Sequence, residues 1–319
     1  MKFRVLSHAG LEVKSESKVL LCDPWLIGST YWRSWWNYPE PDANLVKELK
    51  PDAIYLTHVH WDHFAAPSLR LFSRDTLIIL PQEPAGRMAR DLDSIGFHNY
   101  IEVGHGDSVF VGEIKITVYQ FSIFTDSAAI IESEDTVLFN ANDAKFMGAP
   151  LDQILYNHPK IDFVFKSHSS ANSRVMYSFI DAPEESSFED RDRYINDFLA
   201  FSKSTGARYA VPFASNHCHL HKDVYEFNDY IVTPEQVEIG CNRVDMGSLQ
   251  LKVMLSGDSW DEKEGFDIKK NDFFENREEH LIAYRAKVSE KLEVTYKREA
   301  KAKVNLQRAV AYFEKVFVV

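Results

Sequence analysis

The chain has 319 residues, of which 45% are hydrophobic and 26% charged, a balance typical of a globular protein with a buried core. Its 48 acidic and 36 basic side chains give a formal net charge of -12, which opposes broad binding to nucleic acids or anionic membranes. No run approaches the roughly 20 apolar residues of a membrane span, and the first residues lack the apolar core of a signal peptide.

The first hundred residues alternate between strands and helices. Residues 2–6 and 18–22 have the apolar character of strands, and the polar turn KSESK joins them. This order favours an αβ architecture. Further strands are predicted in residues 51–58 and 76–81, and helices in residues 45–50, 68–74 and 83–97.

Residues 23–41, DPWLIGSTYWRSWWNYPEP, contain four of the six tryptophans of the chain. We interpret this segment as a small aromatic core beneath a long loop, because indole rings gain most from burial. The alternative interpretation is a stacking wall or lid for a substrate, and Trp25 is the candidate contact residue.

The rest of the chain is rich in strands and ends in helices. Glycine pairs and alternating valine and isoleucine predict hairpins in residues 100–121 and 127–143. Strands are also expected in residues 162–168 and 207–215, around a helix in residues 191–206. From about residue 271 the sequence is charged and helical in period, which predicts a solvated amphipathic helix pair.

The three cysteines, Cys22, Cys218 and Cys241, are far apart in the sequence. Their spacing predicts no disulfide framework, and a reducing compartment suits such a chain. We therefore predict a cytoplasmic protein.

Residues 57–64, THVHWDHF, place several metal-binding side chains at the end of a predicted strand. Histidines two apart on an extended segment point the same way, so His58 and His60 can share one ion. Asp62 and His63 then turn toward a second position beside it. Neutral imidazoles and a carboxylate suit zinc, iron or manganese. The pattern predicts a metal centre rather than a group of core histidines.

The spacing HxHxDH after a strand resembles the signature of the metallo-β-lactamase fold superfamily. This resemblance implies a four-layer αββα sandwich that holds two metal ions, with a catalytic domain in residues 1–260 and a helical extension in residues 261–319 packed on it. TVLFNANDAKF resembles the family's strand that ends in a metal-bridging aspartate, which implies this role for Asp143 and a catalytic role beside Asp62. YAVPFASNHCHLH resembles the last strand, which supplies one ligand from His217, His219 and His221.

Several blocks within residues 1–260 resemble, more narrowly, the metallo-β-lactamase-like part of the CMP-N-acetylneuraminate hydroxylase family. These blocks are HVHWDHFAAPSLR, the spacing from TDSAAIIES to LFNANDA, PFASNHCHLHKD and SGDSWD. That family uses a Rieske cluster held by two cysteines and two histidines. Because this chain has no Cys-x-His and Cys-x-x-His pair, an oxygenase of this kind would need a separate electron donor protein or another reductant.

Four residues outside the metal motif have open interpretations. The superfamily usually places a third histidine of the first metal site between His63 and Asp143, whereas this chain has Ser122 there; His8 and His168 are candidate substitutes or hydrogen-bonded histidines. Asp23 either orients a ligating imidazole or forms a turn before proline.

Two functions fit these residues, and a metal-binding scaffold without catalysis is the third possibility. We favour a non-haem diiron monooxygenase that acts on a small anionic or carrier-linked metabolite, because iron tolerates varied ligands and needs open positions. The alternative is a di-zinc or di-manganese hydrolase of an ester, lactone or phosphodiester. The candidate cations for an anionic substrate are Lys145, Lys166, Arg174 and Lys222.

Overall fold

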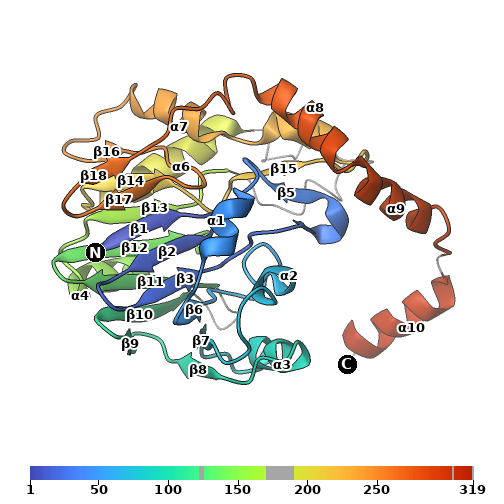
Figure 1. Cartoon of the computed structure of the whole chain (residues 1–319), viewed down its shortest axis with the longest axis horizontal. Helices are drawn as coiled ribbons and strands as arrows, with labels where there is room; N and C mark the ends of the chain where they lie inside the picture. The colour runs from blue at the N-terminus through green and yellow to red at the C-terminus, as the bar shows by residue number, and fades with distance from the viewer. Residues whose placement is uncertain (122–125, 170–189, 304, 318–319) are drawn as a thin grey trace. The chain divides into compact units, whose positions relative to one another are not determined.

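A computed structural model describes residues 1–121, 126–169, 190–303 and 305–317 of the chain. The chain separates into two compact units, Met1–Asn276 and Arg277–Val319. All strands of the described residues belong to the larger unit (Figure 1).

The first sheet brings three strand ends to one edge. Its described strands have the order β18-β17-β1-β2-β3-β6-β7-β8. Because β1 and β3 are both antiparallel to β2, and β3 is parallel to β6, the carboxyl ends of β1, β3 and β6 lie at the same edge. The bounds are β1 Lys2–Val5, β2 Leu11–Lys14, β3 Val19–Cys22, β6 Ala53–Tyr55, β7 Leu77–Pro81, β8 Tyr100–Val103, β17 Ser259–Asp261 and β18 Gly265–Asp267.

The second sheet has the order β16-β14-β13-β12-β11-β10-β9. β11 is antiparallel to β12, so the start of β11 lies at the same edge as the end of β12. A small third sheet has the order β15-β5-β4, in which β5 (Trp35–Asn37) lies between β15 (His217–His219) and β4 (Ser29–Thr30). The second sheet consists of β9 Ser108–Val111, β10 Ile114–Phe121, β11 Asp126–Ser133, β12 Thr136–Asn142, β13 Phe163–Lys166, β14 Tyr209–Pro212 and β16 Gln250–Leu251.

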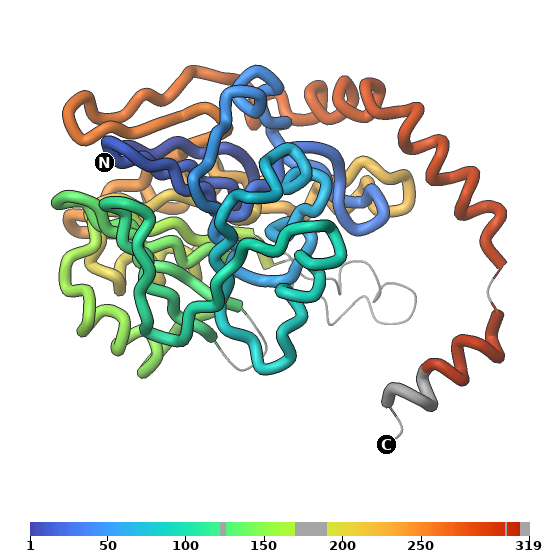
Figure 2. The backbone as a smooth tube through the Cα atoms, turned by 60° about the horizontal axis from the view of Figure 1, so that its bottom comes forward, coloured from blue at the N-terminus to red at the C-terminus, as the bar shows by residue number. Residues whose placement is uncertain are grey.

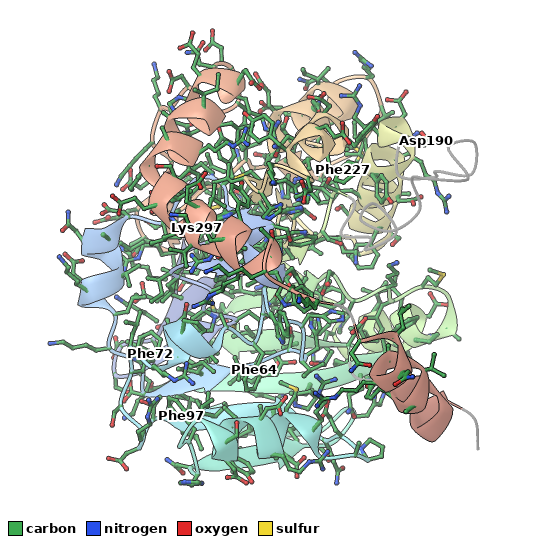
Figure 3. The ribbon with its side chains drawn as sticks, turned by 90° about the vertical axis from the view of Figure 1, so that its right-hand side faces the viewer. Phe64, Phe72, Phe97, Asp190, Phe227 and Lys297 are labelled. Atoms are coloured by element: carbon green, nitrogen blue, oxygen red, sulfur yellow. The ribbon has the colours of Figure 1, made fainter. Side chains whose placement is uncertain are left out.

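Apolar side chains join the two large sheets into one core. Phe3 of β1 packs edge-to-face on Phe163 of β13, with ring centroids 4.9 Å apart. The outer face of the first sheet is covered by α1 (Ala43–Glu48), α2 (Ala66–Leu69) and α3 (Arg87–Ser94), over a cluster that includes Phe72 and Phe97 (Figure 3). The second sheet is covered by α4 (Ala149–Asn157), α6 (Arg191–Ser204) and α7 (Pro234–Cys241). The predicted αββα sandwich is confirmed.

The end of the chain is helical, with α8 (Arg277–Lys287), α9 (Ser289–Glu299) and α10 (Leu306–Phe317). Strand β17 spans the expected boundary at residue 260, β18 follows it, and β17 lies beside β1 (Figure 2). The division between the two units therefore comes later in the chain, after Asn276. Within the described residues, no helix combines the length and apolar character needed to cross a bilayer.

Replacement of Phe163 by alanine is expected to destabilise the larger unit by about 3–5 kcal/mol, because it removes a buried ring and leaves a cavity. Phe163 is 1% exposed and also contacts Tyr209 and Trp260. Urea unfolding followed by far-ultraviolet circular dichroism measures the loss. Phe110→Ala is the control, since that ring is 64% exposed and its removal should cost little; equal losses would contradict the core assignment.

Candidate metal centre

The segment after β6 provides the first group of polar side chains. The strand ends at Tyr55, and the chain then turns so that His58, Asp62 and His63 are buried while His60 is exposed. His58 Nε2 and His60 Nδ1 are 2.9 Å apart. The predicted convergence of these two imidazoles is therefore present in the structure.

Asp23, directly after β3, fixes the orientation of this segment. Its carboxylate accepts hydrogen bonds from the amide and the hydroxyl of Thr57, at 2.8 and 2.6 Å. It also accepts from His63 Nδ1 at 2.7 Å, so His63 Nε2 faces the opposite way. Thr57 Oγ1 lies 3.0 Å from His58 Nδ1 and gives the second imidazole a partner as well. The geometry agrees with both interpretations of Asp23: its carboxylate orients the imidazole of His63, and its backbone forms a turn in which the amide of Trp25 donates to its carbonyl at 2.8 Å.

Asp143 follows β12 at the same edge and lies between the two imidazoles. Its Oδ2 is 3.6 Å from His58 Nε2, and its Oδ1 is 3.7 Å from His63 Nε2. Asn142, before it, has a φ of 36°, which turns the chain sharply out of the sheet. Each carboxylate oxygen of Asp143 therefore faces one of the two histidines.

Asp126 is a candidate ligand that the sequence motifs did not predict. Its carboxylate at the start of β11 can share one ion with His58 and His60, since the three ligand atoms lie within 4.8 Å of one another. Asp126 stands in the TDSA stretch that resembles the hydroxylase family, and Ser122 lies outside the described residues. The sequence did contain a signal for this residue, because the carboxylate of Asp126 is only four positions after Ser122. A search for a third histidine does not consider it.

His8, in the turn between β1 and β2, completes a second group with Asp62 and His63, again within 4.8 Å. Its Nε2 is 3.2 Å from Asp62 Oδ2, and its side chain is buried. The backbone of His8 is held on both sides, by Asn37 Oδ1 at its amide and by the amide of Ala214 at its carbonyl. This histidine lies beside Asp62 and not beside the first group.

The three histidines of the last strand region differ in position. The ring of His217 stacks on Trp35 at 3.8 Å and lies 5.6 Å from that of His8. His219 is 5.3 Å from His217 and packs toward Phe227. Among the described residues, the structure places neither His219 nor His221 in a group with His58 or His63, and His221 Nδ1 is 3.8 Å from Asp223.

The remaining candidates lie in different environments. Trp25 is 1% exposed and its ring packs against that of His8. Its indole therefore has no exposed face that a substrate could contact. Lys166 is buried and donates to the carbonyl of Ala144, whereas Lys145 is exposed. His168 is buried outside both groups, and Arg174 lies outside the described residues.

Burial and the clustered carboxylates shift the pKa values of the centre strongly. Burial alone would lower the pKa of His63, but Asp143, Asp23 and Asp62 raise it to about 10. Burial would raise the pKa of Asp62, yet His63 and His8 hold it well below the usual range. For Lys166, burial dominates and lowers the pKa to about 8. A bound cation would replace the proton of His63, so ion binding should release protons.

The spacing of the ligand atoms around Asp62 fits a metal ion. Donor atoms about 2.1 Å from a tetrahedral ion lie about 3.4 Å apart. His8 Nε2 to Asp62 Oδ2 is 3.2 Å and Asp62 Oδ2 to His63 Nε2 is 3.5 Å, close to that value. Within the described structure, His63 Nε2 and Asp143 Oδ1 are buried without a hydrogen-bond partner, which is costly unless an ion binds there.

Comparison with solved structures identifies the fold class. The metallo-β-lactamase fold protein YhfI from Bacillus subtilis covers 81% of this chain with a TM-score of 0.53 at 13% identity, and 98% of its own chain is matched. An isothiocyanate hydrolase from Delia radicum gut bacteria matches with a TM-score of 0.58 and 17% identity, over 82% of this chain and 99% of its own. CmlA, a diiron β-hydroxylase from Streptomyces venezuelae, matches with a TM-score of 0.52 and 16% identity, over 80% of this chain and 53% of its own. The chain has the metallo-β-lactamase fold.

Curated relatives narrow the resemblance within this fold. One relative, from Mycolicibacterium smegmatis, is named as a Rieske 2Fe-2S iron-sulfur protein. It is 28% identical over 244 residues, which are 72% of this chain and 46% of the relative. The cytidine monophosphate-N-acetylneuraminic acid hydroxylase of Asterias rubens is 42% identical over 69 residues, 21% of this chain and 11% of the relative. The chain thus spans about half the length, or less, of the curated relatives it matches, and no family model matches it.

Replacement of Asp23 by asparagine is expected to weaken metal binding roughly 10- to 100-fold, the usual effect of removing a carboxylate that orients a ligating imidazole. Chelator competition on purified protein measures the affinity, and circular dichroism verifies the fold. The matched control is Asp52→Asn, which removes a carboxylate that contacts Lys18 and Val19 instead. Unchanged affinity in the Asp23 variant would show that His63 does not depend on this hydrogen bond.

Proposed function

We propose that the chain is a cytoplasmic, dinuclear non-haem iron monooxygenase of a small anionic or carrier-linked metabolite. The observation that carries this proposal is the composition of the two side-chain groups. Each contains two histidines and one carboxylate, namely His58, His60 and Asp126 in one group and His8, His63 and Asp62 in the other. Two histidines and one carboxylate with open positions are the ligand set typical of non-haem Fe(II) oxygenases.

Asp143 supports the dinuclear part of the proposal, because one of its oxygens faces each group. In this assignment Asp143 would help to hold both ions. His8 would help to hold the second ion, in place of the last-strand histidines that the resemblance implies, since its Nε2 lies 3.2 Å from Asp62 Oδ2. The three carboxylates offset most of the charge of two divalent ions in this buried setting.

The side chains around the ligands give this assignment a rigid frame. When bound and reduced, a pair of irons supplies dioxygen activation. Tyr31 donates to Asp62 Oδ1 at 2.6 Å, which leaves Oδ2 directed at His8 and His63. Lys166, buried near Asp143, balances part of the carboxylate charge. We assign the anionic group of the substrate to Lys145, which is exposed two residues after Asp143.

We further propose that the electrons come from a Rieske-type 2Fe-2S protein or domain. The support is the name of the Mycolicibacterium smegmatis relative, of which this chain matches only 46%. A one-electron carrier of this kind suits a centre that must be reduced before it binds dioxygen.

The second candidate is a metallo-hydrolase. Two observations support it: the side chain of His60 is exposed, and the isothiocyanate hydrolase from Delia radicum gut bacteria has the same fold. Two zinc or manganese ions in these positions would lower the pKa of a bound water and polarise the substrate. The ligands are the same in both candidates, so the metal and the need for a reductant distinguish them.

Protein purified from iron-supplemented cells is expected to contain two irons per chain and to show near-ultraviolet absorption that bleaches on reduction. Elemental analysis and optical spectroscopy measure both. Tightly held zinc, together with turnover of a chromogenic phosphodiester without reductant, would favour the hydrolase.

Single ligand variants should separate the two ion positions. Asp143→Ala is expected to lose both ions, because Asp143 would help to hold both, whereas Asp126→Ala and His8→Ala should each lose one. His221→Ala is the control and should keep both. Elemental analysis after dialysis against a weak chelator gives the stoichiometry. Loss of an ion in the His221 variant with full retention in His8→Ala would move the contact assigned to His8 to the last strand.

A further inference from the structure

Building on the proposed function, we propose that Trp32 and Trp61 form a binding corner for a flat aromatic ring of the substrate, beside the segment that carries His60 and Asp62. This assignment names a chemical class that the ligand set alone does not specify. It rests on exposure, ring geometry and backbone conformation, three observations that are independent of the metal.

Both indole rings are exposed although they lie next to a buried aromatic cluster. Trp32 is 69% exposed and Trp61 is 44% exposed, whereas Trp25 and Trp35 are 1% and 5% exposed. The two exposed rings are 5.2 Å apart at an angle of 64°. Adjacent large aromatic rings left in water are unfavourable, and such pairs commonly mark binding sites.

The corner is connected directly to a proposed metal ligand. Trp61 stands between His60 and Asp62 in the sequence. Tyr31 stacks on Trp61 at 5.6 Å and 23°, and its hydroxyl donates to Asp62 Oδ1. A ring held in the corner is therefore adjacent to the centre.

The backbone keeps Trp32 in this exposed position. Tyr31, Trp32 and Arg33 have φ values of 46°, 56° and 66°. Three successive residues with side chains in the left-handed region are rare, and such strain persists mainly at functional sites. The turn is held by Trp36 Nε1, which donates to the carbonyl of Arg33, and by Ser34, whose amide and hydroxyl contact Tyr31 O.

The shape of the corner selects for a flat ring. An aromatic ring can stack on one indole and direct its edge at the other, the two arrangements that ring quadrupoles favour. A saturated ring of similar size buries comparable apolar area but has neither a flat face nor a positive edge. The corner should therefore distinguish phenylacetate from cyclohexylacetate, which share the same carboxylate.

Isothermal titration calorimetry of both acids into the whole, metal-loaded chain tests the assignment without turnover. Phenylacetate is expected to bind roughly 2- to 13-fold more tightly than cyclohexylacetate, the range of an aromatic pair. Trp32→Ala should abolish this preference, and Trp32→Phe should retain part of it. Phe110→Ala, which removes a ring of similar exposure from strand β9 (64% against 69% for Trp32), should leave the preference unchanged.

Equal affinity for the two acids, absence of saturable phenylacetate binding, or a preference that survives Trp32→Ala would each overturn the corner. Metal content is measured in every variant and should stay constant, because Trp32 is not one of the assigned ligands. If the chain holds zinc and consumes no oxygen, the oxygenase proposal fails while the preference for the aromatic acid still stands. The two failures are therefore distinguishable.

Discussion

The hydrogen bonds to the Asp23 carboxylate hold the centre together. They connect the end of β3 to the segment after β6 through Thr57, and they fix the ring of His63 so that its second nitrogen faces inward. Asp23 is fully buried, and a buried carboxylate persists only where its acceptor positions are filled. Since the motif HxHxDH leaves the sheet at this point, the directions of its side chains depend on this contact.

Backbone strain is concentrated around the same edge. Apart from Glu134 in a hairpin turn, every described residue other than glycine with positive φ belongs to a segment that borders the centre; these residues are Asp23, Tyr31, Trp32, Arg33, Asn142 and Ala214. Strain of order 1–3 kcal/mol per residue survives only where surrounding contacts enforce it. The core between the two sheets provides that stability, which allows the loops at one edge to adopt conformations suited to ligands.

The sequence was sufficient to predict the sandwich and the segments that carry the candidate centre. It was not sufficient to predict which side chains meet there. HxHxDH and Asp143 follow predicted strands, so periodicity and resemblance locate them. Asp126, at the start of β11, was not predicted, and His8, in the turn after β1, was predicted only as a candidate substitute ligand or a hydrogen-bonded histidine. The nearness of both to the motif depends on strand order, which a linear pattern does not contain. His221 is a different case: alternation on an extended chain groups it with His217, whereas β15 ends at His219.

The origin of the ligands has a consequence for stability. His8, His58, His60, Asp62 and His63 belong to segments of the first sheet, whereas Asp126 and Asp143 belong to the second. Ions bound in the proposed positions would therefore connect the two sheets across the edge of their apolar core. Because such a complete ligand set exists only when both sheets are folded and packed, the free energy of ion binding adds to the free energy of folding. The buried carboxylates and imidazoles, which are costly to desolvate in the metal-free chain, would become stabilising contacts in the ion-bound chain, and ion binding would then be linked to the packing of the sandwich.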